Sequence, residues 1–276
     1  MAILTTPHAV NAPAGSFEAL GFPVIHVPET SSTQNNLREL WAQAQPWTTI
    51  FTDYQHAGRG RLGRNWESGR GKSLLATSLV CIPDSVEARK RLGWIPLIGA
   101  LSLQSALSQL TGTTQFQIKW PNDVVVKVAG QTRKLAGILG EYYGEVDGEL
   151  RVGLGVGCNL HQDSLDLFPG STSLAELGTP EITRADLLTT YLREFQTRMG
   201  RWNEPDHLGT IVAELNDLLA YRGQEITVAG QTGVVIGVNL DANLELLADD
   251  KQIIVTTEDL ALHITERSGN EQNPRS

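Results

Sequence analysis

The sequence is poor in the residues that build disulfide frameworks and metal cages. It contains two cysteines in 276 residues, Cys81 and Cys158, and both lie in apolar, strand-like surroundings. Its six histidines are scattered and do not join the cysteines at the spacing of metal ligands. The sequence therefore predicts a cytoplasmic protein with reduced thiols and no metal site built by the protein alone.

Long hydrophobic runs and surplus positive charge are also missing. No stretch reaches the roughly 18 consecutive apolar residues of a membrane helix, and the first residues show no basic segment before an apolar one. Asp and Glu number 31 against 22 Lys and Arg, which leaves a formal net charge of -9. Wrapping nucleic acid needs a surplus of Lys and Arg on the binding face. We therefore expect no membrane span and no DNA partner, and any basic feature has to be local.

Apolar periodicity predicts an α+β fold with one large core and a small appendage. The closely spaced strands between residues 115 and 160 imply antiparallel pairing, and the pattern changes to short strands after Tyr221. Strands are expected at 23–27, 48–54, 73–81, 115–120, 123–127, 135–143 and 150–160, and helices from 31 or 32, at 97–110, from 184 and at 208–219. The predicted organisation is a loose segment at 1–22, a main domain at 23–221, a small barrel at 222–266 and a flexible tail at 267–276.

The basic feature is the segment 55–64, in which three arginines alternate with three glycines. Arg70 and Lys72 follow, so five cations and a single acid, Glu67, fall between residues 59 and 72. Glycines let backbone amides approach phosphate oxygens closely, and arginine supplies planar, permanently charged donors. A solvated flexible loop is the alternative, but the glycine alternation directly after an apolar strand favours a site for an anion.

The same segment matches the letters of a dinucleotide-binding fingerprint through Gly58, Gly60 and Gly63. That fingerprint needs a helix to open at the third glycine, because the helix N-terminus holds the pyrophosphate. Here Trp66 and then a strand follow. We therefore reject the dinucleotide interpretation.

Three other stretches carry polar groups at the ends of predicted elements. Residues 31–35 place hydroxyl and amide groups at a helix start, 119–123 end a strand on a proline and a carboxylate, and 134–141 begin an apolar strand with a lysine. Each has a structural alternative, namely an N-cap, a strand turn and a lysine whose stem lies along apolar surface.

In combination these stretches resemble a known family. SSTQN, GRGRLGR, KWPND and KLAGILGE, in this order, are similar to the signatures of biotin protein ligases, and the likeness extends from about residue 22 into the C-terminal module. GLGVGCNL at 153–160 and TSL at 172–174 resemble two further family motifs, and Gly223, Gly237 and Asp241 fall in a module similar to the family's SH3-like barrel. The resemblance implies the fold of class II aminoacyl-tRNA synthetases and biotin synthetases, a mixed, largely antiparallel sheet flanked by helices, plus that barrel.

The resemblance also implies a reaction. Biotin and ATP, the latter with Mg²⁺, would form biotinyl-5'-AMP, and biotin would then pass to a lysine of a biotin carboxyl carrier protein of acetyl-CoA carboxylase or a related carboxylase. Arg59, Arg61 and Lys134 would offset the repulsion between the carboxylate and the phosphates. Asp123 would act in the second step, where orienting the lysine, deprotonating it and binding Mg²⁺ stay open as its roles.

Short polar groups are expected around the fused ring of biotin. Trp66 and the glycines of the core strands are expected to lie against the apolar surface of biotin. The expected binding residues are Ser32, Thr33, Gln34, Gln55, Gly58, Arg59, Gly60, Arg61, Arg64, Trp66, Lys119, Asn122, Lys134, Gly137, Gly155 and Asn159.

Two other functions compete with this interpretation. A lipoate-type ligase uses a related architecture, and a nucleotide-sensing regulator without turnover would also use an arginine loop. Only about 22 residues precede the first core strand, too few for a helix-turn-helix domain, so we expect an enzyme that binds no DNA. A monomer and a homodimer are equally compatible with the sequence.

Overall fold

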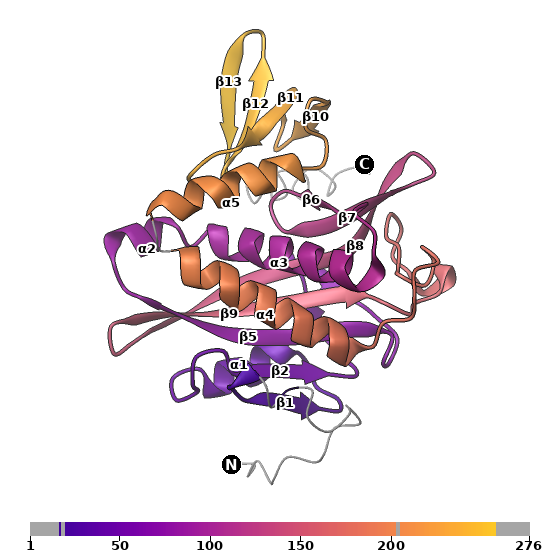
Figure 1. The fold of residues 1–276 in the computed structure, drawn as a ribbon, viewed down its shortest axis with the longest axis vertical. Helices are drawn as coiled ribbons and strands as arrows, with labels where there is room; N and C mark the ends of the chain where they lie inside the picture. Colours follow the sequence, from indigo (N-terminus) through magenta and orange to yellow (C-terminus); the bar gives the residue numbers. More distant parts are fainter. Residues whose placement is uncertain (1–16, 18–19, 203–204, 258–276) are drawn as a thin grey trace, which may run out of the picture.

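The computed structural model describes residues 17, 20–202 and 205–257. The strands of its main sheet are β1 (Val24–Val27), β2 (Thr49–Thr52), β5 (Ser73–Pro83), β6 (Gln117–Lys119), β7 (Asp123–Val128), β8 (Gln131–Val146) and β9 (Glu149–Asn159). They lie in the order β1-β2-β5-β9-β8-β7-β6 (Figure 1). β1 and β2 pair in parallel, and every other neighbouring pair is antiparallel. The expected mixed, largely antiparallel sheet is confirmed.

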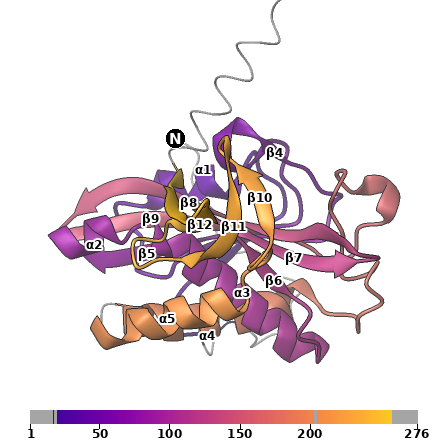
Figure 2. The ribbon, with the colours of Figure 1, turned by 90° about the horizontal axis from the view of Figure 1, so that it is seen from above.

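Helices flank this sheet on both faces. They are α1 (Thr33–Leu40), α2 (Val86–Lys90), α3 (Trp94–Thr111), α4 (Arg184–Trp202) and α5 (Pro205–Asp217). Figure 2 shows α3, α4 and α5 on one face and α1 on the other, together with the hairpin of β3 (Gly58–Arg59) and β4 (Asn65–Trp66). β4 stands where a dinucleotide-binding fingerprint would need a helix. None of the described helices has the length and apolarity to cross a membrane.

Four helices differ from the expectation: α3 and α5 begin three residues before the expected positions 97 and 208, and α1 and α2 differ as follows. α2 was not predicted, because five residues are too few to show a repeating apolar pattern. Its one sequence signal is the N-cap Ser85, whose side chain accepts a hydrogen bond from the Ala88 amide. α1 ends at Leu40, although the apolar positions continue through Trp41 to Ala44. Trp41 and Ala44 still pack against the small core under α1, so their apolar character reflects burial in the turn that follows the helix.

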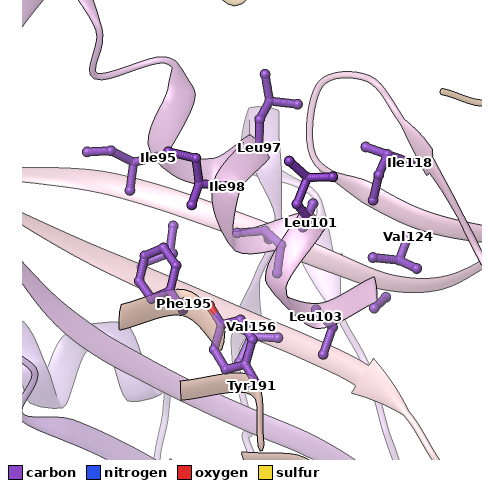
Figure 3. Close-up of a cluster of buried hydrophobic side chains, with 14 of the residues drawn as sticks. Ile95, Leu97, Ile98, Leu101, Leu103, Ile118, Val124, Val156, Tyr191 and Phe195 are labelled. Carbon is purple, nitrogen blue, oxygen red and sulfur yellow. The ribbon is translucent and has the colours of Figure 1, made fainter. Parts of the chain in front are cut away.

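The main core lies between α3, α4 and the sheet, as Figure 3 shows. α3 is buried along most of its length, which confirms the expectation drawn from its nearly continuous apolar sequence. On α4, the rings of Tyr191 and Phe195 stack with centroids 5.8 Å apart. A second, smaller core of Leu37, Ile50 and Leu79 fastens α1 to the opposite face.

The two faces of β9 differ because side chains alternate along a strand. Val152, Leu154, Val156 and Cys158 point into the main core. The intervening Gly153, Gly155 and Gly157 therefore turn toward α1 and the β3-β4 hairpin. This face carries no side chains over three successive positions, which leaves room for other groups to lie directly on the sheet.

A separate four-stranded antiparallel sheet follows α5. It consists of β10 (Glu225–Val228), β11 (Gln231–Val238), β12 (Leu244–Ala248) and β13 (Lys251–Val255). The indole N-H groups of Trp94 and Trp120 donate to the carbonyls of Leu240 and Ala242 at 2.7 and 2.9 Å, so this sheet rests on the main domain as expected. Residues 258–266 of the predicted barrel, the tail at 267–276 and most of the predicted segment at 1–22 lie outside the described residues.

The first prediction concerns the main core. Leu101→Ala removes a fully buried side chain from α3 and should lower the free energy of unfolding by about 2–5 kcal/mol, because a cavity is left among closely packed neighbours. Val86→Ala is the control, since its side chain is 63% exposed, and should change stability by less than about 0.5 kcal/mol. Equal urea midpoints for the two variants would contradict this description of the core.

Candidate active site

A cavity of about 650 Å³ opens on the sheet face that carries α1 and the β3-β4 hairpin. Every residue predicted from the sequence lines it, apart from Gly58. Those lining residues are Ser32, Thr33, Gln34, Gln55, Arg59, Gly60, Arg61, Arg64, Trp66, Lys119, Asn122, Asp123, Lys134, Gly137, Gly155 and Asn159. Gly58 lies beneath Gln55, where an added Cβ would come within 2.9 Å of the Gln55 Nε2 atom. The structure thus brings five separate sequence motifs to one cavity.

The start of α1 forms a neutral polar wall of the cavity. The Thr33 amide donates to Gln55 Oε1 at 2.8 Å, and the hydroxyls of Thr33 and Thr77 are 2.8 Å apart. The buried N-cap, Ser32, makes no side-chain capping bond. The Ser32 hydroxyl and the Gln55 Nε2 donor are therefore not consumed in capping the helix and can face a ligand.

Gln34 is held by the protein on all sides. Its Nε2 donates to the carbonyls of Leu139 at 3.0 Å and Gly153 at 3.3 Å, and the Tyr143 hydroxyl donates to its Oε1. Burial raises the pKa of the Tyr143 hydroxyl, so this group stays a donor at neutral pH. The ligand-binding role predicted for Gln34 stays a prediction, and its contacts are those of a residue that ties α1 to the sheet.

The charged end of the cavity is centred on Asp123. Lys134 Nζ lies 2.7 Å from Asp123 Oδ1, a close ion pair without hydrogen-bond geometry. Burial lowers the pKa of the Arg61 guanidinium; the nearby Asp123 carboxylate opposes this shift and the Arg64 charge adds to it. Arginine remains protonated through such a shift. Lys134 therefore pairs with Asp123 while the Arg61 charge interacts with the same carboxylate, and the net charge of these three groups is positive.

The five cations between residues 59 and 72 do not act as one group. Arg70 pairs with Glu29 and lies over the Tyr54 ring, and Lys72 is 2.9 Å from both Asp163 and Asp166. The guanidinium of Arg59 donates to Glu141 at 3.2 Å. Arg61 and Arg64 are the two that remain at the cavity without an ion pair in the described part of the chain.

The floor of the cavity is the glycine face of β8 and β9, with Trp66 resting on it. An added Cβ on Gly157 would come within 2.6 Å of the Trp66 ring, and one on Gly137 within 2.9 Å of Lys134 Nζ. Lys134 Nζ is 5.5 Å from the Trp66 ring centroid. The Trp66 indole N-H is buried and has no hydrogen-bond partner among the described residues. Missing side chains in the floor thus set where both groups lie.

Two remaining predicted residues act mainly as anchors. Asn122 Nδ2 donates to the Ile138 carbonyl at 2.6 Å, and the Ile138 amide donates back to the Asn122 carbonyl at 2.9 Å. Asn159 Nδ2 donates to the Thr172 carbonyl at 3.1 Å. Lys119 and Asp123 are backbone partners in the antiparallel pairing of β6 with β7. The Lys119 side chain is exposed at the rim of the cavity.

Sequence reasoning missed the segment after β9, of which Gln162 and residues 166–171 line the cavity. Backbone hydrogen bonds from Lys134 N to the Gly170 carbonyl and from Thr172 N to the Lys134 carbonyl hold it beside β8. That contact joins residues 36 or more positions apart, so no local pattern could reveal it. Thr77 was missed as well, although a polar residue in an apolar strand such as 73–83 is a usable signal.

Among the described residues, no group of three His, Cys, Asp or Glu side chains could hold a metal ion. The cavity does contain the carboxylates of Asp123, Glu67 and Asp166. Mg²⁺ is commonly held by one or two carboxylates together with the phosphates of a substrate. This donor set fits a Mg²⁺ that enters with a nucleotide.

The fold and the cavity define the class of protein. Residues 24–159 match the biotin/lipoate A/B protein ligase family, and the chain belongs to this family. Its curated relatives include the bifunctional ligase/repressor BirA of Bacillus spizizenii, with 33% identity over 66% of this chain and 55% of the relative. The biotin--[acetyl-CoA-carboxylase] ligase of Mycobacterium tuberculosis is 29% identical over 75% of this chain and 73% of the relative.

A solved structure extends the likeness over most of the chain. The biotin protein ligase from Aquifex aeolicus in complex with biotin and ATP superimposes with a TM-score of 0.69 at 26% identity, covering 86% of this chain and 97% of that one. Membership predicted from the four motifs is confirmed. The chain spans 55% of the length of the Bacillus relative, so activity and partners are argued separately below.

The second prediction concerns the cavity floor. Gly157→Ala should lower the free energy of unfolding by about 1–3 kcal/mol, because the new methyl group would overlap the Trp66 ring. Gly200→Ala is the matched control: nothing lies within 4 Å of its added Cβ in α4, so it should be neutral or stabilising by up to about 1 kcal/mol. An unchanged denaturation midpoint for Gly157→Ala would show that Trp66 does not rest on β9.

Proposed function

We propose that this chain is an ATP-dependent biotin protein ligase that forms biotinyl-5'-AMP and transfers biotin to a lysine of a biotin carboxyl carrier protein. One observation carries the proposal: the neutral polar wall at Ser32, Thr33 and Gln55 and the cationic cluster at Arg61 and Lys134 share one cavity. A ligand with a polar uncharged head, an apolar body and a carboxylate tail matches this order of groups. The names of its relatives and the biotin and ATP in the Aquifex aeolicus complex support the same substrates.

In the first step a biotin carboxylate oxygen forms a bond to the α-phosphorus of ATP, and the bond to the β-phosphate oxygen breaks. Pyrophosphate leaves with that electron pair. Both reactants are anions, so fixed positive charge has to offset their repulsion. Arg61 and Lys134 supply it. The ion pair with Asp123 holds Lys134 in place beforehand, and the Arg61 charge interacts with the same carboxylate. Mg²⁺, when bound with ATP, shields the triphosphate.

The neutral wall would hold the ring of biotin. Its ureido carbonyl accepts hydrogen bonds and its two N-H groups donate them, and the Ser32 hydroxyl and Gln55 Nε2 are the groups left for this exchange. The apolar ring and tail would lie on the glycine floor at Gly137 and Gly155 beside Trp66. A ligand without the ureido group would leave these polar groups of the wall unpaired, and this cost provides specificity for biotin.

In the second step the amine of the acceptor lysine attacks the acyl carbon, an amide forms and AMP leaves. The attacking nitrogen loses a proton, and Asp123 is the carboxylate at the cationic end that can accept it or orient the amine.

Further parts of the proposal follow from the family. The four-stranded C-terminal sheet would be completed as an SH3-like barrel spanning residues 222–266. The carrier would be that of acetyl-CoA carboxylase or a related carboxylase, as the name of the Mycobacterium tuberculosis relative suggests. We propose a cytoplasmic setting, because the reaction consumes ATP and both Cys81 and Cys158 are free thiols. The active form would be a monomer or a homodimer.

The third prediction tests the activity itself. The purified protein should exchange labelled pyrophosphate into ATP only when biotin is present, because the exchange requires reversal of biotinyl-5'-AMP formation. Lipoate at the same concentration is the control and should support at least about a hundredfold less exchange, since its ring cannot pair with the polar wall. Equal exchange with lipoate would favour a lipoate ligase. Absence of exchange with either acid would favour a regulator without turnover.

The fourth prediction separates the roles of Asp123. Asp123→Asn keeps the side-chain volume but removes the charge and the proton acceptor. Biotin-dependent pyrophosphate exchange should persist within about tenfold, whereas biotin transfer to the carrier should fall on the order of a hundredfold or more. Loss of exchange that is restored by raised Mg²⁺ would instead assign Asp123 to metal binding. Lys134→Met should instead lose exchange by about a hundredfold or more, and transfer from biotin and ATP should fall with it because transfer needs the adenylate.

A further inference from the structure

We propose that Lys127 and Thr132, which lie opposite each other on the hairpin of β7 and β8, form a subsite for the β- and γ-phosphates of ATP and for the pyrophosphate that leaves. The inference rests on the proposed function and extends it, because the first step leaves pyrophosphate without a partner of its own in the protein. Thr132 lines the cavity. Lys127 is exposed beside it and was not among the site residues predicted from the sequence.

The pairing of β7 with β8 places both side chains on the cavity face. Lys127 is opposite Thr132, and Val125 is opposite Lys134. Side chains two positions apart on a strand lie on the same face of the sheet. Val125, Lys134 and Thr132 all line the cavity, so Lys127 extends this face toward the end of the hairpin.

The other face of the hairpin turns toward the main core. Val124 and Val126 are part of that core, and Arg133 is opposite Val126. Arg133 therefore lies on the face away from the cavity, although it directly follows Thr132. The turn at 129–130, where φ is 48° and 79°, is the two-residue kind with positive φ that fixes the register of a hairpin. Lysine and arginine are thus held on opposite faces.

Lys127 is a cation without an acidic partner. It is diagonal to Lys134, and such neighbours on one face of a sheet lie about 7–8 Å apart. Lys134 is 2.7 Å from Asp123, whereas Lys127 forms no ion pair within the described part of the chain. Like charges at neighbouring positions repel each other. In a chain with a net charge of -9, an unpaired lysine beside a second lysine indicates an anionic ligand.

The order of the strands gives the direction in which ATP would extend. The cavity crosses the main sheet from Gln55 after β2, over Thr77 on β5 and the glycine floor of β9 and β8, to β7 (Figure 1). A biotin ring at the polar wall would direct its carboxylate over this floor to Lys134. In displacement at phosphorus the attacking and leaving oxygens lie roughly in line, on opposite sides of the phosphorus. The leaving phosphates would therefore lie over β7, on the side of Lys127.

The two side chains suit a leaving pyrophosphate. A lysine ammonium offers three charged N-H donors, and a threonine hydroxyl adds a neutral donor. When the bond to the α-phosphorus breaks, its electron pair goes to the departing oxygen, and negative charge grows on the phosphates joined to it. A cation beside those phosphates stabilises this charge.

The test removes the charge of Lys127 and reads the two steps separately. Lys127→Gln should raise the KM for pyrophosphate in biotin-dependent exchange, and the KM for ATP, on the order of tenfold, the loss expected for one charge-assisted hydrogen bond. The KM for biotin at saturating ATP should stay within about twofold of the wild-type value. Transfer from preformed biotinyl-5'-AMP to the carrier should not change, because pyrophosphate takes no part in it.

The matched control is Arg133→Gln, which removes one positive charge from the same hairpin on the face away from the cavity. Its KM values should equal those of the wild type, and Lys127→Arg should keep most of the affinity for pyrophosphate. Equal effects of Lys127→Gln and Arg133→Gln would show a general electrostatic field and overturn the subsite. A slower transfer from the preformed adenylate in Lys127→Gln would assign Lys127 to carrier binding instead.

A binding measurement separates this inference from the proposed function. Calorimetric titration with magnesium pyrophosphate needs no turnover, and the Kd should rise on the order of tenfold in Lys127→Gln but not in Arg133→Gln. A wild type that binds no pyrophosphate, or a Kd that is unchanged in Lys127→Gln, would overturn the subsite. A wild type that binds pyrophosphate but shows no biotin-dependent exchange would instead refute the proposed function, and the comparison of the variants would still decide where pyrophosphate binds.

Discussion

The structure depends on one constraint, which is that β9 carries glycine at three successive positions of the face toward α1 and β8 carries Gly137 beside them. Gly153, Gly155 and Gly157 alternate with residues that fill the main core, so the same strand closes the core on one side and leaves space on the other. Gln34 and the Trp66 ring occupy part of that space directly against the sheet. A Cβ at Gly153, Gly155 or Gly157 would crowd Gln34 or Trp66, and the cavity depends on the absence of side chains at these positions.

Around this floor the basic side chains differ in the acidic side chains with which they pair. Arg70 pairs with Glu29, Lys72 pairs with Asp163 and Asp166, and Arg59 pairs with Glu141. Lys134 pairs with Asp123, whose charge also acts on Arg61. Partial burial strengthens the electrostatic field of the cations that remain. An acidic protein can thus present a small positive region to anionic substrates without a basic surface.

Much of the arrangement could be predicted from local patterns. Apolar periodicity located the strands and long helices, and the glycine and arginine spacing in 58–64 predicted an anion site rather than a dinucleotide-binding helix start. Sixteen of the predicted site residues line one cavity, and most of them lie at the ends of predicted elements or in the loop that joins two predicted strands. The parallel pairing of β1 with β2, the short helix α2 and the cavity segment 166–171 were not predictable, since they depend on packing between distant segments.

The sequence by itself determined the kinds of groups available: a glycine stripe, an arginine loop, a lysine at a strand start and a carboxylate after a proline. Those properties are local, because residue type and spacing set charge, backbone freedom and the face on which a side chain lies. Only the tertiary structure decided which charges meet. Lys134 lies 2.7 Å from Asp123 and Arg59 lies 3.2 Å from Glu141, because strand register and helix placement set distances that no spacing along the chain contains.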